Sequence, residues 1–202
     1  MSRSCLNFRM ARKTFEEAQQ TRRRILDTAF RHCQERGYEG LSLADVAQEA
    51  QVTRGAIYHH FAGKQALFLE MVEELLGRMG DAIVESAEKA PDTWQSLLDG
   101  CRTFLEASQT EAYQTIILGQ APAVLGTEHW NRLDQQYTTH SLNSVLIELV
   151  AEGVILIPDT RAAAEALSGA MNQLSRWVAA GHPLKTAWDT LELLLKSLLA
   201  KE

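Results

Sequence analysis

The segment from Thr53 to Phe61 (TRGAIYHHF) concentrates side chains that suit contact with DNA. On a helix, its first residues would meet base edges in a major groove about 12 Å wide. The guanidinium of Arg54 fits guanine O6 and N7 together, and Gly55 lets the helix backbone come close. Ser42 and Lys64 open the neighbouring helices, where they are placed to bind phosphate. The predicted DNA contacts are Arg22, Ser42, Thr53, Arg54, Gly55, Tyr58, His59, His60 and Lys64.

Several of these residues also have a purely structural interpretation. Ser42 and Thr53 are good helix N-caps in any protein, and Arg22 could belong to a solvated basic face. His59 and His60 are adjacent, so on a helix they point about 100° apart. We therefore predict no metal site at this histidine pair.

A helix-turn-helix would present these side chains, and the flanking sequence predicts one. Apolar residues at helical spacing indicate a first helix over 15–36. Two short helices, over 43–50 and 54–61, are joined by a three-residue turn, with Ser42 and Thr53 as their N-caps.

The pattern stays helical beyond this motif. A long amphipathic helix starts at Lys64, and further helical runs cover about 91–109, 127–152, 159–180 and 184–200. No alternation of apolar and polar residues indicates a strand. The predicted fold is all-α with about nine helices: an N-terminal three-helix helix-turn-helix domain and a C-terminal helical domain.

The last two helical runs carry more apolar surface than one helical hairpin would bury. Such a pair is typical of a four-helix bundle made with a second copy of the chain. The residues expected at this dimer interface are Leu167, Met171, Leu174, Val178, Leu184, Trp188, Leu191 and Leu195.

The middle helices carry aromatic and polar side chains that could line a small-molecule cavity. Binding cavities are mostly apolar with a few polar groups, although any single one of these residues could equally be core. The candidates are Phe104, Tyr113, Gln120, Trp130, Tyr137 and His140.

Charge is distributed unequally along the 202 residues. Residues 1–66 hold 11 Lys/Arg against 7 Asp/Glu, net +4, whereas residues 67–202 hold 9 against 19, net −10. A phosphate backbone would attract the first part and repel the second. The two parts therefore have different expected tasks.

Other function classes find no support in the sequence. Cys5, Cys33 and Cys101 have no metal-ligand spacing, and no nucleophile elbow or phosphate-binding loop appears, so we expect no enzyme, cofactor or metal. No run of 18 apolar residues occurs, and the basic N-terminus lacks an apolar leader. These features predict a cytoplasmic protein, whose translation could start at Met1 or Met10.

Residues 10–70 resemble the DNA-binding domain of the TetR family of transcriptional regulators. The resemblance rests on Thr21-Arg22 through Ile25-Leu26-Asp27-Thr28-Ala29, on Gly37-Tyr38-Glu39-Gly40-Leu41-Ser42, and on Gly55-Ala-Ile-Tyr-His-His-Phe61 followed by Lys64. The segments Met10-Ala-Arg-Lys-Thr and Glu17-Ala-Gln-Gln-Thr-Arg are similar to the multidrug-efflux-repressor branch, the AcrR-like proteins.

The resemblance implies a domain organisation and a function. Residues 15–66 would bind DNA, residues 67–202 would bind an effector and dimerise, and residues 1–14 would form an arm or a disordered extension. The expected protein is a repressor, released from a near-palindromic operator by a small apolar or amphipathic molecule, with efflux or detoxification genes as possible targets. A transcriptional activator, a non-DNA-binding adaptor and an enzyme on this scaffold remain alternatives.

Two residues depart from the family pattern. Gln51 stands in the turn where a glycine is common, so the turn is expected to be strained or differently shaped. His59 stands where efflux repressors often have tryptophan, so their operator sequence does not carry over.

Overall fold

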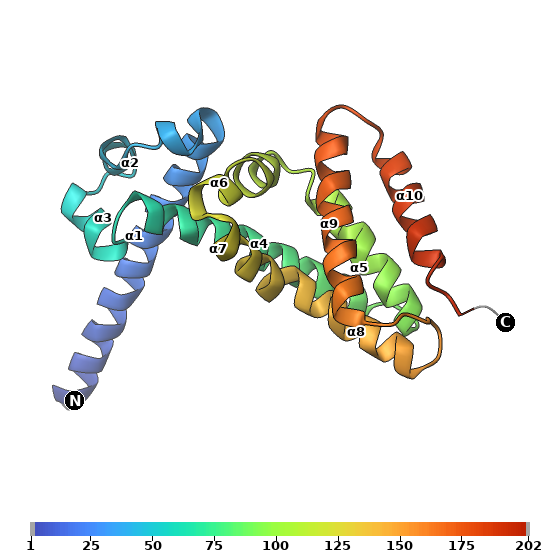
Figure 1. The fold of residues 1–202 in the computed structure, drawn as a ribbon. Helices are drawn as coiled ribbons and strands as arrows, with labels where there is room; N and C mark the ends of the chain where they lie inside the picture. The colour runs from blue at the N-terminus through green and yellow to red at the C-terminus, as the bar shows by residue number, and fades with distance from the viewer. Residues whose placement is uncertain (1–2, 201–202) are drawn as a thin grey trace. The chain divides into compact units, whose positions relative to one another are not determined.

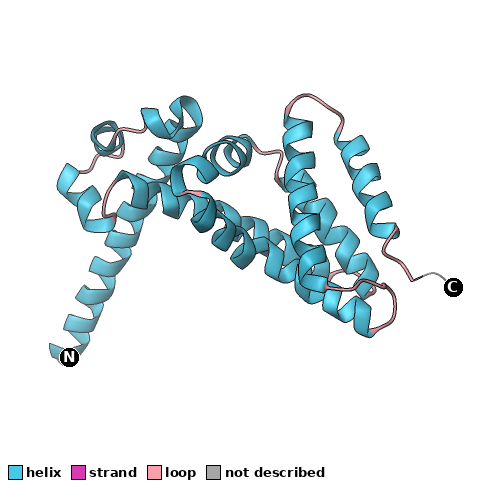
Figure 2. Cartoon of the chain, viewed as in Figure 1, coloured by secondary structure: helices cyan, strands magenta, loops and turns pink. Residues whose placement is uncertain are grey.

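A computed structural model describes the backbone of residues 3–200 and the side chains of residues 15–200. The described residues are helical almost throughout and include no β-strand, only one isolated bridge between Ile155 and Leu199 (Figure 2). The elements are α1 (Arg3–Gly40), α2 (Leu43–Glu49), α3 (Arg54–His60), α4 (Lys64–Glu88), α5 (Thr93–Ala107), the π-helical segment η1 (Tyr113–Gln120), α6 (Ala121–Leu125), α7 (Thr127–Asp134), the π-helical segment η2 (Gln135–Thr139), α8 (His140–Ala151), α9 (Thr160–Ala179) and α10 (Leu184–Lys196).

The predicted all-α fold with about nine helices is confirmed for the described residues. Segment η1 continues directly into α6, and α7, η2 and α8 follow one another without a break. Counted as continuous runs, the helical elements from Arg3 to Lys196 number nine. None of these helices is both long and apolar enough to cross a membrane.

The chain divides into two compact units, Met1–Met71 and Val72–Glu202, and the division falls inside α4. In the first unit, α2 and α3 pack beside α1 (Figure 1). Its core is formed by apolar residues of α1, α2, α3 and the first two turns of α4. The buried residues include Ile25, Leu26, Ala29, Phe30, Val46, Ala47, Ile57, Phe61, Leu67 and Phe68.

Helix α1 is longer than the pattern indicated. Its helical backbone begins at Arg3 rather than near residue 15. The start was predicted from the spacing of apolar residues, which follows the helical period only from Phe15 onward. The stop predicted at Gly37 appears as a kink: Gly37 has φ 70° and ψ 177°, and one further turn follows to Gly40. Residues 1–2 and the side chains of residues 3–14 lie outside the described part, so the predicted arm stays a prediction.

The second unit is a helical bundle in which α9 packs on α5, α8 and α10. Residues 113–125, which the sequence pattern did not assign to a helix, form η1 and α6, and Pro122 stands in the first turn of α6, where a proline needs no hydrogen-bonded N–H. The chain turns only at Gly126, which has φ 80°. The helix predicted over 127–152 is confirmed as the run α7, η2 and α8, with η2 as a π-helical interruption.

Candidate nucleic-acid interface

One face of α3 is left open to solvent by the packing of the first unit. Ile57 is buried against the core, whereas Thr53, Arg54, Gly55, Tyr58 and His59 are exposed. Tyr58 keeps 49% of its surface exposed. The structure thus brings five of the predicted DNA contacts together on one surface.

Arg54 and Tyr58 lie one helical turn apart and contact each other. The Arg54 guanidinium carbon is 5.8 Å from the centre of the Tyr58 ring, and Nη2 of Arg54 lies 3.5 Å from the Tyr58 hydroxyl oxygen. The tyrosine thereby restricts the directions that the guanidinium can take. A pre-positioned guanidinium loses less side-chain entropy when it binds a planar acceptor pair such as guanine O6 and N7.

Ser42 and Thr53 are both helix N-caps. The Oγ of Ser42 accepts a hydrogen bond from the Asp45 amide at 3.3 Å, and the Oγ1 of Thr53 accepts one from the Ala56 amide at 3.1 Å. Capping uses an oxygen lone pair, so each hydroxyl keeps its proton for donation to a phosphate. The structural and DNA-binding interpretations of these two residues are therefore compatible.

The turn between α2 and α3 holds one residue, Gln51, in a strained backbone conformation. Gln51 has φ 55°, in the left-handed region that a glycine would occupy without penalty. The amide of Val52 donates to the Ala47 carbonyl at 2.9 Å, which closes the turn. The strain expected at Gln51 is present.

Two predicted phosphate contacts are engaged inside the first unit. The Lys64 ammonium donates to the Glu39 carbonyl at 3.1 Å and lies 4.5 Å from the centre of the Tyr38 ring. Arg22 forms an ion pair with Glu70 and lies 5.4 Å from the centre of the Phe61 ring. Lys64 and Arg22 thus each link α1 to α4. Either side chain would bind a phosphate only through N–H groups that these contacts do not use.

The two histidines of α3 differ in environment. His59 is exposed, whereas His60 is half-buried with its ring edge toward His59, the centroids 5.3 Å apart. Burial, and then the charges of His59 and Arg22, lower the pKa of His60 below its ordinary value of 6.5. His60 is therefore neutral at pH 7 and can offer a phosphate only an uncharged N–H. The described residues include no His, Cys, Asp and Glu cluster that could hold a metal.

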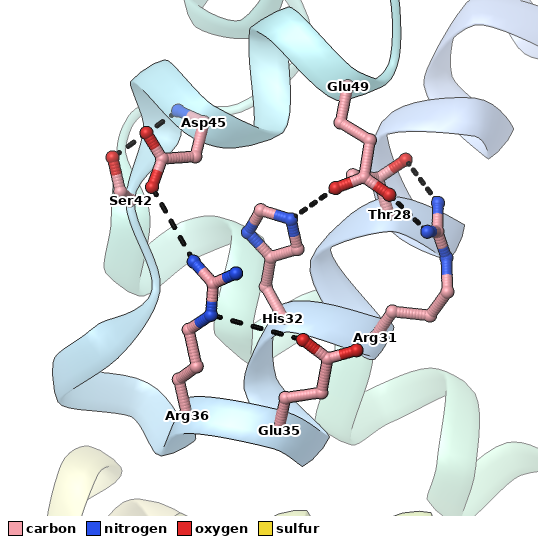
Figure 3. Close-up of polar contacts among 8 residues, drawn as sticks. All are labelled: Thr28, Arg31, His32, Glu35, Arg36, Ser42, Asp45 and Glu49. Carbon is pink, nitrogen blue, oxygen red and sulfur yellow. Dashed lines mark hydrogen bonds and ion pairs between the residues drawn. The ribbon is translucent and has the colours of Figure 1, made fainter.

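A polar network that the sequence analysis missed ties α2 to α1 (Figure 3). Nε2 of the buried His32 lies 2.6 Å from Oε2 of Glu49, and Arg31 forms an ion pair with the same carboxylate. The hydrogen bonds from His32 and then Arg31 lower the pKa of Glu49. Arg36 reaches Asp45 at 3.7 Å, near the start of α2. This network positions α2, and through it the turn that sets the direction of α3.

The second unit contains an apolar cavity of about 80 Å³. Of the six predicted ligand residues, only Phe104 lines it. Tyr113 is buried with its ring edge-on to Phe104, Trp130 is buried, and Gln120 and Tyr137 are half-buried outside the lining. His140 lines a separate polar cleft. The cavity lining is Ile83, Val84, Ala87, Ser96, Leu97, Gly100, Cys101, Phe104, Thr138, Ser141, Leu142, Val145 and Met171.

The predicted dimer interface needs correction. Leu167, Met171, Trp188, Leu191 and Leu195 are buried within the same subunit, so they have no surface left for a partner. The reason is that α9 and α10 cover α5 and α8 of their own chain, which the helical period alone does not reveal. Leu174, Val178 and Leu184 remain partly exposed, and the exposed leucines of α10 are Leu193, at 70%, and Leu194, at 46%.

Cys33 is buried in the first unit, and Cys101 lines the apolar cavity of the second unit. Burial raises the pKa of Cys33 to about 11 and that of Cys101 to about 12, so both are protonated at neutral pH. Neither Cys33 nor Cys101 forms a disulfide.

The first unit thus has the architecture of a helix-turn-helix DNA-binding domain, carried by a second, larger helical unit. Comparison with known proteins places both units. Residues 25–71 match the family model described as bacterial regulatory proteins, tetR family, and residues 94–200 match the one described as tetracyclin repressor-like, C-terminal domain. The chain belongs to the TetR family.

Individual relatives agree with this assignment. The transcriptional regulator AcrR of Shigella flexneri is 40% identical over 110 residues, which cover 54% of this chain and 51% of that protein. SrpR of Pseudomonas putida is 31% identical over 131 residues, 62% of this chain and 58% of that protein. The chain thus spans just over half the length of these two curated relatives.

A solved structure matches over nearly the whole chain. A TetR-family transcriptional regulator from Pectobacterium atrosepticum is 33% identical, with a TM-score of 0.77, covering 92% of this chain and 97% of that one. TetR regulators bind operator DNA and act as dimers with small-molecule effectors.

Proposed function

We propose that this protein is a ligand-responsive transcriptional regulator that binds operator DNA as a homodimer and represses the genes beside it. The observation that carries the proposal is the exposed face of α3. Thr53, Arg54, Gly55, Tyr58 and His59 share that face, while Ile57 anchors the opposite side in the core. These side chains are suited to contacts in a major groove. Residues 1–66, which include them, carry a net charge of +4, as expected of a surface that approaches DNA.

Each contact residue has a distinct proposed task. Arg54 specifies a guanine through two hydrogen bonds, and Tyr58 holds its guanidinium in place. The hydroxyl protons of Thr53 and Ser42 bind phosphates and fix the register without specifying sequence. Lys64 contributes mainly by holding the start of α4 on Glu39, and adds a phosphate contact with its remaining protons.

The homodimer would present two copies of α3 to successive major grooves, about 34–36 Å apart, on a near-palindromic site. The partner surface on α10 is assigned to the exposed Leu193 and Leu194. On α9 it includes the partly exposed Leu174 and Val178. This surface replaces the buried residues that the helical period indicated.

The effector is assigned to the second unit. A ligand that prefers one arrangement of the dimer lowers DNA affinity by its difference in affinity for the two arrangements. Since the first third of the chain resembles efflux repressors, efflux or detoxification genes are the first targets to examine.

The decisive experiment is fluorescence anisotropy of the purified protein on DNA from immediately upstream of its own gene, with random DNA of equal length, over a range of salt. Preference for the upstream fragment by about 10³ or more, with steep salt dependence, is the expected result. Arg54→Ala should remove most of that preference. The control Arg78→Ala removes an exposed arginine from the second unit, where it pairs with Glu74, and should leave the preference intact. Equal affinity for both fragments at every salt concentration would refute regulation at this site.

A further inference from the structure

A polar cleft of about 270 Å³ lies in the second unit, apart from the apolar cavity. It is bounded by η2, by the start of α8 and by the start of α9, which packs on both. The buried Thr139 and Ala164 form its floor, and longer polar side chains surround them. Thr138 of the same π-helical segment lines the apolar cavity, so η2 separates the two spaces. The cleft is slightly smaller than the about 300–1,000 Å³ of drug-sized sites, and so suits a small molecule.

Two side chains bring opposite charges to this cleft. Arg161 and Glu165 lie four residues apart on α9, a spacing at which opposite charges commonly pair on a helix. Gln135 instead donates to Oε1 of Glu165 at 2.7 Å. Among the side chains of residues 15–200, the Arg161 guanidinium has no hydrogen-bond or ion-pair partner, Glu165 included. The cleft therefore presents a positive and a negative charge that are held apart.

The place of Arg161 on its helix favours an anion beside it. Arg161 stands in the first turn of α9, where the helix dipole presents its positive end and a cation is unfavourable. Asp159 caps this end by accepting from the Ala162 amide at 2.8 Å. A carboxylate bound at Arg161 would be attracted by the guanidinium and by the helix end together. His140 of α8 lines the same cleft, is exposed, and adds an imidazole N–H.

An unsatisfied acceptor lines the cleft as well. Oδ1 of Asn143 is buried and has no hydrogen-bond partner among the described residues. Buried polar atoms are nearly always paired with protein, water or a ligand. A carbonyl oxygen only accepts, so its partner must carry an N–H or O–H group. With the carboxylate of Glu165, the cleft thus offers two kinds of acceptor to a donor such as an ammonium group.

We propose that this cleft binds a small zwitterion, with a carboxylate at one end and an ammonium group at the other. The Arg161 guanidinium donates two parallel hydrogen bonds to the carboxylate, and His140 donates beside it. Glu165 and Oδ1 of Asn143 accept from the ammonium. Because Arg161 and Glu165 do not meet, a short chain separates the two charges of the ligand. The site is additional to the apolar cavity and goes beyond the proposed function, since it does not depend on DNA binding.

Isothermal titration calorimetry of the DNA-free protein with three five-carbon probes tests this site. The probes are 5-aminopentanoate, pentanoate and n-pentylammonium, which share a chain and differ in the charges at its ends. The zwitterion should bind at least about tenfold more tightly than either singly charged probe, because each end adds a charge-assisted contact. Equal affinity for the zwitterion and either of the other probes, or no binding of the zwitterion at millimolar concentration, would overturn the proposal.

Two variants assign the ends of the ligand. Arg161→Gln should weaken binding of the zwitterion and of pentanoate, and leave n-pentylammonium unchanged. Glu165→Gln should weaken binding of the zwitterion and of n-pentylammonium, and leave pentanoate unchanged. Arg176→Gln is the matched control, because it removes an exposed arginine of the same helix that does not line the cleft. Unchanged zwitterion affinity in Arg161→Gln, or an equal loss in Arg176→Gln, would overturn the assignment to this cleft.

The test is separable from that of DNA binding. Arg161 and Glu165 are exposed, so both variants should stay folded, which thermal melts of each variant check. Calorimetry on the free protein judges the cleft whether or not an operator is found. The anisotropy experiment on upstream DNA judges the regulator whether or not the zwitterion binds.

Discussion

Replacement of Gly55 by alanine is expected to change stability and DNA binding in opposite directions. A Cβ at this position meets nothing closer than Thr53 Oγ1 at 3.8 Å, an ordinary van der Waals distance, so the protein itself accepts the methyl group. Alanine is more stable than glycine in a helix by about 0.5–1 kcal/mol. Gly55 is in the first turn of α3, which favours the lower value. For a chain of this size the melting temperature should rise by about 1–3 °C.

The same methyl group should obstruct the DNA. Gly55 lies on the exposed face of α3 between Thr53 and Tyr58, and an added methylene in a tightly packed contact costs about 1–3 kcal/mol. Since about 1.4 kcal/mol is a factor of ten, affinity per half-site should fall by about 5- to 150-fold. Such a loss arises between the molecules, because nothing inside the protein is displaced.

The assay pairs differential scanning calorimetry with anisotropy on the preferred DNA fragment. Gly77→Ala in α4 is the matched control, since its Cβ would meet only Tyr137 Cε1 at 3.9 Å, and Gly77 lies outside the unit that carries α3. It should also raise the melting temperature, with DNA affinity unchanged. The reasoning fails if Gly55→Ala binds DNA within about twofold of the wild type, or if its loss of affinity is accompanied by loss of stability.

Four further substitutions follow from the contacts described. Leu193→Glu should shift the protein from dimer to monomer in sedimentation while it stays folded, and an intact dimer would refute the revised interface. Leu191→Glu should instead lower the free energy of unfolding of the subunit by several kcal/mol, because Leu191 is fully buried. Lys64→Met should lower both the melting temperature and DNA affinity, and an unchanged melting temperature would contradict the structural part of its role. The pKa of His60 is lower in the folded state than in the unfolded state, so protonation favours unfolding and stability is lost as pH falls below about 6.5. His60→Gln should reduce that loss of stability in urea melts between pH 7 and pH 5. If the variant and the wild type had the same pH dependence, His60 would not be its source.

The DNA-binding surface could be predicted from sequence because its determinants are local. Thr53 caps α3, and Ile57 fixes by its spacing which side of the helix is buried, so the exposed side follows from helical geometry. The strain at Gln51 was predicted from the resemblance, because the family often has a glycine at this position of the turn, and Gln51 has φ 55°. The hydrogen-bond partner of Lys64 could not be predicted in this way. Lys64 donates to the Glu39 carbonyl, 25 positions away, and no local pattern indicates that contact.

The second unit was harder because its surfaces are decided by packing. Leu191 and Leu193 have the same chemistry and stand two residues apart, yet one is buried and the other is 70% exposed. An apolar stripe indicates that a helix face is covered, but not whether its own chain or a second copy covers it. The hydrogen bond that Ser168 of α9 donates to Asp134 joins residues 34 positions apart, and no local pattern indicates it.

The size of the cavity bears on how an effector could release DNA. Moving occupancy from 99:1 to 1:99 requires about 5.5 kcal/mol of differential affinity. A cavity of about 80 Å³ holds roughly three methylene-sized groups, at about 30 Å³ each, and each buried methylene contributes about 0.8 kcal/mol. The apolar part would thus supply about 2 kcal/mol per site, and two sites, with about 4–5 kcal/mol together, would fall short even if all of it were differential. Because Ile83 and Val84 of α4 line the cavity and Lys64 begins the same helix, filling the cavity acts on the element that leads to the DNA-binding unit.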